Sequence, residues 1–383
     1  MTQVGGMTNA RVTDDSPPHA AGPAAPAAPP RTTELVIPGL IEPAGMQLRE
    51  RDLRAPAAGE VLVAMEATGV SYAEVQMLRG RYPGQPAFPF VPGYDVVGRV
   101  VAIGPDVDRA LAGKRVATMT GFGAWSELIV LRADELVIVP EALDPAEVDT
   151  LIVNGVTAYK MLHRVARVRS GQTIVVLGAG GGVGTLLVQL ARLAGVNVIG
   201  TCRPAQRAAV EALGARVIDY TRGRVLEEVR ALAPAGVDAV FDHVGGAASL
   251  RGSYALLRPG GYLVCYGNAS RAKTDGSPWW GVLEFLALKA LWSVRPGGRK
   301  TTFFDVWGRG TLGADHLLRP RRFWREFRDD LGKLLELLAE GRLKPEVARR
   351  FPLREAAAAL AAHQAGGFTG KIVLQGGAAA TSA

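Results

Sequence analysis

The sequence has few cysteines and few histidines, and it has no long apolar run. Of its 383 residues, two are cysteine and five are histidine. Two cysteines exclude a framework of several disulfides and a cysteine-rich structural zinc site. No stretch reaches the roughly 18–20 uncharged apolar residues that a membrane span requires. The N-terminus also lacks the basic-then-apolar pattern of a secretory signal, so we expect a cytoplasmic protein without a membrane partner.

The charge balance is positive but mixed. The 44 Lys and Arg residues outnumber 36 Asp and Glu residues, which gives a net charge of +8. This balance suits an anionic ligand such as a phosphorylated cofactor. No motif combines aromatic and basic residues in the manner of nucleic-acid recognition, so we expect no nucleic-acid partner.

Composition separates tails from folded sequence. Residues 1–33 are rich in Ala, Pro and Gly. They carry too little apolar bulk to offset the entropy of ordering, so we predict a disordered tail there and another at 378–383. From residue 34 to about 140, short β-branched runs separated by Gly and Pro predict a β domain.

From about residue 151, predicted strands and helices alternate. Strands are expected at 173–177, 197–201, 216–218, 237–241 and 262–266, with helices at 183–194, 205–213, 225–232 and 248–257. This alternation is typical of a doubly wound parallel sheet. Two further helices, at 323–339 and 354–364, precede a last strand at 371–374, which we expect to rejoin a sheet.

The segment 268–325 holds five of the six tryptophans. Two interpretations stay open. The aromatic side chains could line an apolar acceptor pocket or a mobile lid, or they could pack as a second core or a dimer contact.

The strongest chemical signal is the glycine-rich turn at 178–184. It follows a buried strand and precedes an amphipathic helix, which is where a dinucleotide-binding turn lies. The glycines allow the backbone to approach a pyrophosphate, and the helix start offers free N–H groups. The spacing fits G-x-x-G-x-x-G through Gly178, Gly181 and Gly184. It also fits the short-chain reductase spacing through Gly178, Gly182 and Gly184.

The short-chain interpretation fails on its catalytic chemistry. That family requires a tyrosine with a lysine four residues later, and no tyrosine in this chain has one. The large domain before the glycine turn also counts against it.

The second strand of this unit indicates NADP in preference to NAD. An NAD site places an acidic residue near the end of that strand. Here the strand ends Gly200-Thr201-Cys202-Arg203 without one. Arg203 and Arg207 could bind a 2′-phosphate through charge-assisted bonds. The alternative is that both arginines lie on the solvated face of a helix start.

Several ordered motifs resemble the medium-chain dehydrogenase/reductase superfamily, in its zinc-independent quinone oxidoreductase (zeta-crystallin-like) branch. They lie at 69–74, 80–83, 89–98, 154–159, 178–184, 257–261, 341–345 and 370–374. The resemblance implies an α/β protein with a GroES-like β domain at 34–155, a Rossmann NADP-binding domain at 156–300 and a return to the first domain at 301–377. The active site is then expected in the cleft between the domains.

Zinc-dependent relatives hold a catalytic metal with Cys, His and a third ligand. Here Ser71 occupies the first ligand region, and residues 34–150 contain neither His nor Cys. We therefore expect no metal at that place. Without a Lewis acid to polarise an alcohol, the site should favour hydride delivery to a conjugated acceptor.

The resemblance also assigns cofactor-binding residues. The phosphate turn uses Gly178, Gly181, Gly182, Val183 and Gly184. The adenosine 2′-phosphate is surrounded by Arg203, Arg207 and Tyr220. The nicotinamide end is formed by Ser71, Asn154, Thr157, His243, Gly267 and Asn268, where a capping or packing role is also open for His243. Three departures concern the substrate pocket: Ser71 replaces an asparagine, Glu74 an aspartate and Gln76 a tyrosine.

These residues predict 1,4-reduction by NADPH of an enone, an enoyl thioester or a quinone. Tyr82 matches the tyrosine that similar enoyl reductases use as a donor, and Tyr72 is the second candidate. Water as the proton source, with Tyr82 only packing the loop or cofactor, is the alternative. We expect a homodimer acting on a small molecule, and the Ala-, Arg- and Gly-rich composition suggests bacterial secondary metabolism. The rival functions are a non-catalytic NADPH-binding protein with a structural, RNA-binding or membrane-trafficking role, and an imine or carbonyl reductase.

Overall fold

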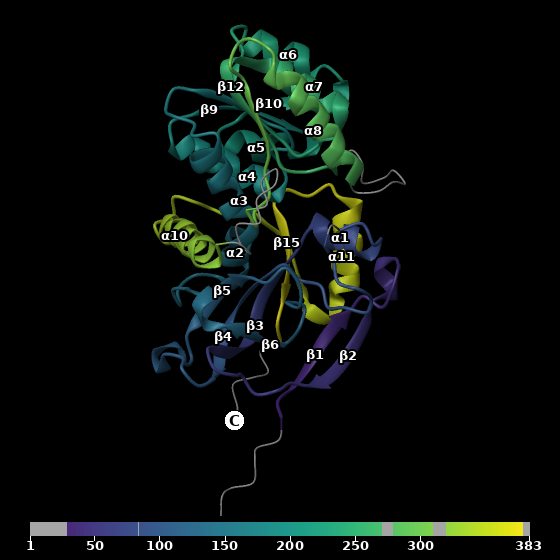
Figure 1. The fold of residues 1–383 in the computed structure, drawn as a ribbon, viewed down its shortest axis with the longest axis vertical. Coiled ribbons are helices and arrows are strands. Elements are labelled where there is room, and N and C mark those ends of the chain that lie inside the picture. Colours follow the sequence, from purple (N-terminus) through teal and green to yellow (C-terminus); the bar gives the residue numbers. More distant parts are fainter. Residues whose placement is uncertain (1–28, 83, 270–278, 309–318, 378–383) are drawn as a thin grey trace, which may run out of the picture.

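The computed structural model describes residues 29–82, 84–269, 279–308 and 319–377. Two lobes lie one above the other (Figure 1), and the last part of the chain returns to the lobe in which the first strands lie. Residues 1–28 of the predicted tail at 1–33, and the whole predicted tail at 378–383, fall outside the described residues.

The first lobe is built on a sheet whose strand pairs are antiparallel except for β14 with β15. Its main sheet has the order β14-β15-β3-β4-β5-β7, with β6 paired to β3. A separate antiparallel pair is formed by β1 and β2. The strands are β1 Arg31–Val36, β2 Gln47–Asp52, β3 Glu60–Val70, β4 Asp95–Ile103, β5 Arg115–Met119, β6 Leu128–Arg132, β7 Val137–Ile138, β14 Val347–Pro352 and β15 Lys371–Gln375. Pairing of β15 with β3 confirms that the last strand rejoins a sheet.

The second lobe is a six-stranded parallel sheet with the order β10-β9-β8-β11-β12-β13. The strands are β8 Thr173–Val176, β9 Asn197–Cys202, β10 Arg216–Asp219, β11 Val237–Asp242, β12 Leu257–Cys265 and β13 Lys300–Phe303. Its helices are α4 Gly182–Leu193, α5 Arg207–Ala212, α6 Val225–Leu232, α7 Gly246–Leu256 and α8 Trp279–Ser293.

Both faces of this parallel sheet are covered by helices, as the apolar run of β8 requires. Ile174 and Val176 pack in the cluster that contains Leu187 of α4. Val175, between them, packs in the cluster that contains Leu250 of α7. Successive strand side chains point to opposite faces, so burial of both sets demands a helical layer on each side. The predicted doubly wound architecture is confirmed.

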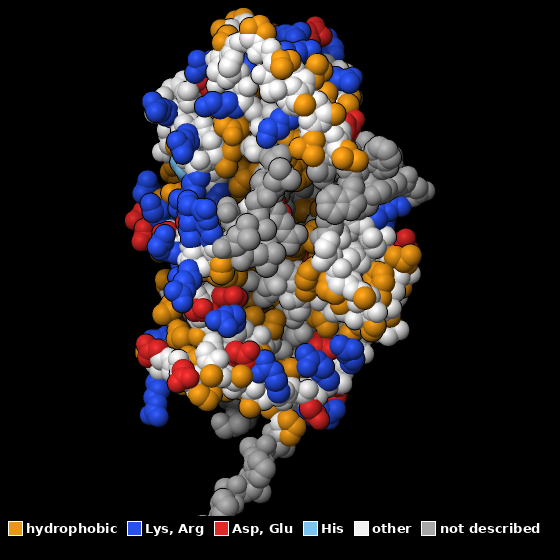
Figure 2. Space-filling view, viewed as in Figure 1, with side chains coloured by type: hydrophobic (Ala, Val, Ile, Leu, Met, Phe, Trp, Pro, Cys, Tyr) orange, Lys and Arg blue, Asp and Glu red, His pale blue; other side chains and the backbone are white. Residues whose placement is uncertain are grey.

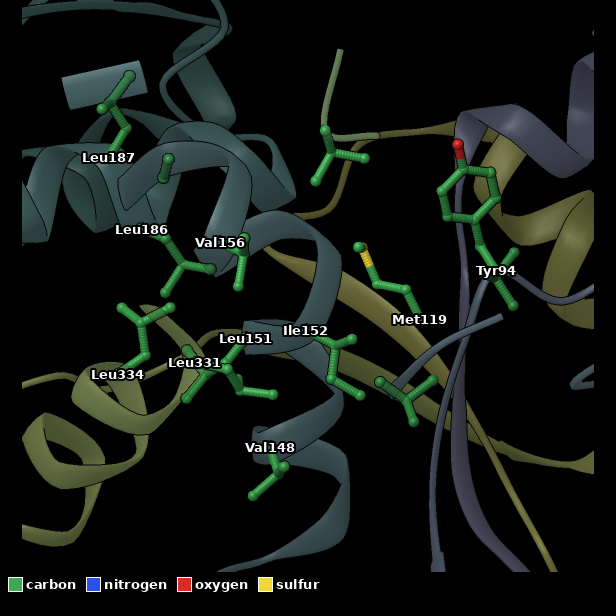
Figure 3. Close-up of a cluster of buried hydrophobic side chains, with 14 of the residues drawn as sticks. Tyr94, Met119, Val148, Leu151, Ile152, Val156, Leu186, Leu187, Leu331 and Leu334 are labelled. Atoms are coloured by element: carbon green, nitrogen blue, oxygen red, sulfur yellow. The ribbon is translucent and has the colours of Figure 1, made fainter. Parts of the chain in front are cut away.

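Helical segments join the lobes. They are α1 Tyr72–Leu78, α2 Pro145–Thr150, α3 Val156–Tyr159, α10 Pro320–Ala339 and α11 Ala356–Ala365, with π-helical turns at Leu151–Gly155 and Lys160–Val165 on either side of α3. Their buried side chains form one continuous cluster with α4 (Figure 3), which includes Val148, Leu151, Ile152, Val156, Leu186, Leu187, Leu331 and Leu334. The segment that carries Asn154 and Thr157 is therefore held from both lobes.

Two predicted boundaries differ from the structure. Strand β1 begins at Arg31, inside the predicted tail, because Thr32 and Thr33 are buried where β1 pairs with β2. Strand β13 extends the parallel sheet beyond residue 300, the predicted end of the nucleotide-binding domain. In both places the decisive contact is strand pairing, which the local composition does not show.

The tryptophan-rich segment has two environments. Trp292 stacks on Tyr254 with 4.2 Å between ring centroids, inside the core of the parallel-sheet lobe. Trp307 and Trp324 instead pack against Phe323 at the start of α10. The side chains of Trp279 and Trp280 fall outside the described residues.

Candidate active site

The glycine-rich turn leaves the end of β8 and enters α4. Gly178 has a left-handed φ of 68°, and a side chain there would clash with the imidazole of His243. A side chain at Gly182 would clash with Nδ2 of Asn154. Gly181, at the N-cap of α4, provides no side-chain cap. The first amides of α4 are therefore free to bind an anion.

A cavity of about 890 Å³ opens beside this turn, at the carboxyl ends of the parallel strands. Residues of the turn, of β9, of α6 and of α7 line one side, and a segment between α11 and β15 lines the other. That segment is bound to the turn: the Gly370 amide donates to the Gly180 carbonyl at 3.1 Å, and Gln206 Nε2 donates to the Phe368 carbonyl at 2.6 Å. The cavity is thus shared between the two lobes.

One end of the cavity is cationic. Arg203 Nε donates to the Tyr220 hydroxyl at 2.9 Å, and both side chains line the cavity together with Arg224. Arg207 pairs with Glu211 at 2.8 Å, one helical turn away, and is not among the lining residues. The structure therefore brings Arg203 and Tyr220 together and leaves Arg207 aside. Sequence reasoning missed Arg224.

Of the six residues predicted for the nicotinamide end, His243 alone is among those that line the cavity. His243 Nδ1 lies 3.0 Å from the Leu177 carbonyl. Burial lowers the pKa of His243, so a neutral ring donates through Nδ1 and leaves Nε2 as an acceptor. Thr157 is buried on α3. The Gly267 backbone packs against His243.

Asn268 offers a polar atom without a partner. Its Oδ1 is buried and has no hydrogen-bond partner among the described residues. A buried acceptor of this kind costs free energy unless a donor reaches it. Asn268 does not line the cavity itself, but it directly precedes Ala269, which does. The uncapped helix start and the Arg203–Tyr220 pair fit the phosphates of a dinucleotide.

Gln206 and Thr201 complete the turn and were also missed. Gln206 bonds to the Phe368 carbonyl, and the Gly178 amide donates to Thr201 Oγ1 at 3.1 Å. Thr201 directly follows Gly200 at the end of the second predicted strand, so its position next to the turn could have been inferred. The partner of Gln206 is 162 residues away along the chain and could not.

Ser71 is held by its own helix. It caps α1, accepting from the Ala73 amide at 3.1 Å and donating from Oγ to Glu74 Oε2 at 2.6 Å. Glu74 is fully buried, and burial raises the pKa of its carboxyl to about 7. Tyr72, the second predicted donor, is 38% exposed on the first turn of this helix.

The buried Glu74 carboxyl should make stability depend on pH. Its pKa is near 4.5 when unfolded and about 7 when folded. The folded protein therefore keeps the proton longer, and stability present below pH 4.5 is lost as pH rises through 7. We expect Glu74→Gln to remove about 3 kcal/mol of this loss. Urea unfolding of the wild type and of Glu74→Gln at pH 5 and pH 8 measures the difference. If the free energy of unfolding changed equally with pH in the two proteins, this prediction would be contradicted.

Tyr82 lies in a cluster of aromatic side chains. Its hydroxyl is hydrogen-bonded to the hydroxyl of Tyr94, and Trp307 Nε1 donates to the same Tyr94 oxygen at 2.6 Å. Burial raises the pKa of Tyr82 well above its ordinary value. A tyrosine with this environment stays protonated and acts better as a hydrogen-bond donor than as an acid. Tyr94 was missed, although it lies within the motif at 89–98.

A smaller cavity, of about 270 Å³, lies at the start of α10. Lys160, Arg164, Arg319 and Arg322 line it, with Asp305 and Glu326 as the acidic residues. Lysine and arginine side chains gather on this part of the surface (Figure 2). The end of β13 contributes to the wall through Phe303.

Comparison with known proteins identifies the family. Residues 57–141 match the alcohol dehydrogenase GroES-like domain, and residues 213–374 match the zinc-binding dehydrogenase family. The chain is 30% identical over 338 residues to the human synaptic vesicle membrane protein VAT-1 homolog, covering 86% of this chain and 82% of the relative. It is 29% identical over 342 residues to a probable quinone oxidoreductase of Schizosaccharomyces pombe, covering 86% and 92%.

This chain belongs to the medium-chain dehydrogenase/reductase superfamily. Within it, the similarities support the zinc-independent quinone oxidoreductase-like branch. The structure of a mycobacterial protein in complex with NADPH aligns with a TM-score of 0.74 and 27% identity, covering 90% of this chain and 99% of that one. The predicted combination of a GroES-like domain with a Rossmann-type parallel sheet is confirmed.

The quinone oxidoreductase relative places the chain in an oxidoreductase family, and the NADPH-bound neighbour indicates a nicotinamide cofactor for this family. Among the described residues, no group of three His, Cys, Asp or Glu is arranged to hold a metal ion. None of the helices in the described part of the chain is long and apolar enough to span a bilayer.

Proposed function

We propose that this protein is an NADPH-dependent reductase of activated double bonds or quinones. The observation that supports this proposal most directly is the cavity that extends from the Arg203–Tyr220 pair past the glycine turn to His243. The mycobacterial structure with NADPH and the relative named a quinone oxidoreductase support the same cofactor and class of acceptor.

Each part of the cavity has a role in this proposal. The free amides at the start of α4 bind the pyrophosphate, and Arg203 with Tyr220 binds the phosphate that distinguishes NADPH from NADH. The buried Asn268 Oδ1 accepts a hydrogen bond from the nicotinamide amide. NADPH bound in this way supplies a hydride to the β-carbon of the acceptor.

Negative charge then develops on the carbonyl oxygen of the acceptor. The Tyr82 hydroxyl donates a hydrogen bond to that oxygen, because its raised pKa keeps it protonated. Water supplies the proton that completes addition across the double bond. This assigns Tyr82 an orienting role in preference to that of an acid.

Oxidation of NADPH, followed by absorbance, tests the proposal against a panel of a quinone, an enone, an enoyl thioester and a cyclic imine. We expect turnover with at least one conjugated acceptor, and a preference for NADPH over NADH of at least about tenfold from the phosphate contacts. Turnover with the imine alone would overturn the proposed acceptor class.

Tight NADPH binding without oxidation by any acceptor would favour a non-catalytic role. There is a specific reason to test for this outcome, because the similar human protein is named a synaptic vesicle membrane protein and not a reductase. Binding and turnover are therefore measured on the same preparation.

A further inference from the structure

Tyr94 and Trp307 form a hydrogen-bonded contact between the lobes. Tyr94 directly precedes β4 in the first lobe, and Trp307 follows β13 in the second. Their rings lie 5.8 Å apart between centroids. Trp307 also packs over Gly121 and is stacked on Phe323 of α10 at 5.9 Å. The geometry of this contact therefore depends on the relative position of the two lobes.

The position of Tyr94 is set by its backbone. Its carbonyl accepts from the amides of Thr120 at 2.9 Å and Gly121 at 3.3 Å. The side chain is 8% exposed and lies in the cluster with Met119 and Val156 (Figure 3). Val156 follows the turn that carries Asn154. The Tyr94 ring is thus held in the same core cluster as the segment that reaches the glycine turn.

The chemistry of the groups settles the direction of the hydrogen bonds. An indole N–H only donates, so the Tyr94 oxygen accepts from Trp307. If Tyr82 also donated to Tyr94, the Tyr94 proton would have no acceptor among the described residues, at a buried position. Donation from Tyr94 to Tyr82 satisfies every group of Tyr94. The Tyr82 proton is then left over, on the more exposed of the two residues.

We propose that Tyr94 is a positioning residue, which accepts from Trp307, donates to Tyr82 and so directs the Tyr82 proton toward the acceptor oxygen. The inference rests on the proposed function, because it assigns an acceptor oxygen to the free proton. The hydrogen bond from Tyr94 explains why the Tyr82 hydroxyl is oriented as it is. The contacts between the aromatic rings alone do not explain that orientation. Donation through a chain also polarises the last hydroxyl, which strengthens its bond to a developing oxyanion.

A double-mutant cycle on turnover tests this chain. Tyr82→Phe is expected to lower kcat and kcat/KM about 100-fold, as loss of an oxyanion donor does. Tyr94→Phe is expected to lower both about tenfold, with KM for NADPH unchanged. The double variant should be no slower than Tyr82→Phe, since Tyr94 acts only through Tyr82.

Two further variants control for folding. Tyr262→Phe removes a hydroxyl on β12, outside the aromatic cluster, and should leave kcat within about twofold of wild type. Trp307→Phe keeps an aromatic ring but removes the donor, and should cost about threefold in kcat in wild type and nothing further in Tyr82→Phe. This second cycle decides the question if Tyr94→Phe fails to fold.

The outcomes are distinct. The positioning role would be overturned if turnover of the double variant Tyr82→Phe/Tyr94→Phe fell by the product of the two single effects. It would also be overturned if the kcat of Tyr94→Phe stayed within twofold of wild type. Neither result would contradict the proposed reductase function. A wild-type protein that oxidises NADPH with none of the acceptors would overturn the proposed function and this inference together.

Discussion

Lys371→Met is expected to lower the free energy of unfolding by about 3–5 kcal/mol. Lys371 Nζ lies 2.7 Å from Asp95 Oδ2 and 2.8 Å from Asp149 Oδ2, and all three side chains are buried. Burial alone lowers the pKa of Lys371, but the charges of Asp149 and Asp95 outweigh it and hold the pKa above its ordinary value. Without the ammonium, two carboxyl groups remain in the interior with no cation.

The same substitution should weaken the site. Lys371 begins β15 and directly follows Gly370, whose amide donates to the Gly180 carbonyl of the glycine turn. Chemical denaturation measures the stability, and NADPH titration measures the accompanying loss of affinity. The segment that forms one wall of the cavity is thus fixed by a buried ion pair.

A control and a pH comparison separate this effect from general damage. Arg350→Ala removes the cation of an exposed pair with Asp144, and should cost under about 1 kcal/mol. The deficit of Lys371→Met should shrink toward pH 5, because burial raises the pKa of Asp149 and a protonated carboxyl costs less to bury. A deficit below about 1 kcal/mol at pH 8 would contradict the buried ion pair as the source of stability.

Arg203→Ala is expected to raise the Kd for NADPH about 10- to 100-fold and to leave the Kd for NADH unchanged. Charge-assisted hydrogen bonds contribute about 1.5–3 kcal/mol each, and only NADPH carries the phosphate that receives them. Arg203 is held at the cavity by Tyr220. Calorimetric titration with both coenzymes measures the change.

The matched control is Arg207→Ala. Because Arg207 is paired with Glu211 and lies outside the cavity lining, the Kd for NADPH should change less than about threefold. Equal weakening of NADPH and NADH by Arg203→Ala would remove the phosphate assignment. A large effect of Arg207→Ala would show that the arginine rearranges when the coenzyme binds.

Features that depend on neighbours in sequence could be predicted. The glycine turn, the helix after it and the strand before it lie within about twenty residues, and their periodicity is local. The pairing of Arg207 with Glu211, one helical turn apart, was also accessible from the sequence. This helical spacing would have predicted that Arg207 pairs with Glu211, so that Arg203 alone of the two arginines is left to bind the phosphate.

Contacts between distant segments could not be predicted. Trp307 and Tyr94 are separated by 213 positions, and Lys371 and Asp95 by 276. Both contacts arise from the return of the chain to the first lobe and from the way the lobes meet. Tyr94 lay in a recognised motif, yet nothing in that motif indicates that its hydroxyl bonds to Tyr82.

The most direct test of the account is a crystal structure with NADPH bound. It should show the pyrophosphate against the free amides at the start of α4, the adenosine phosphate against Arg203 and Tyr220, and the nicotinamide amide donating to Asn268 Oδ1. Coenzyme absent from this cavity at saturating concentration, or bound with its phosphates away from the start of α4, would contradict it.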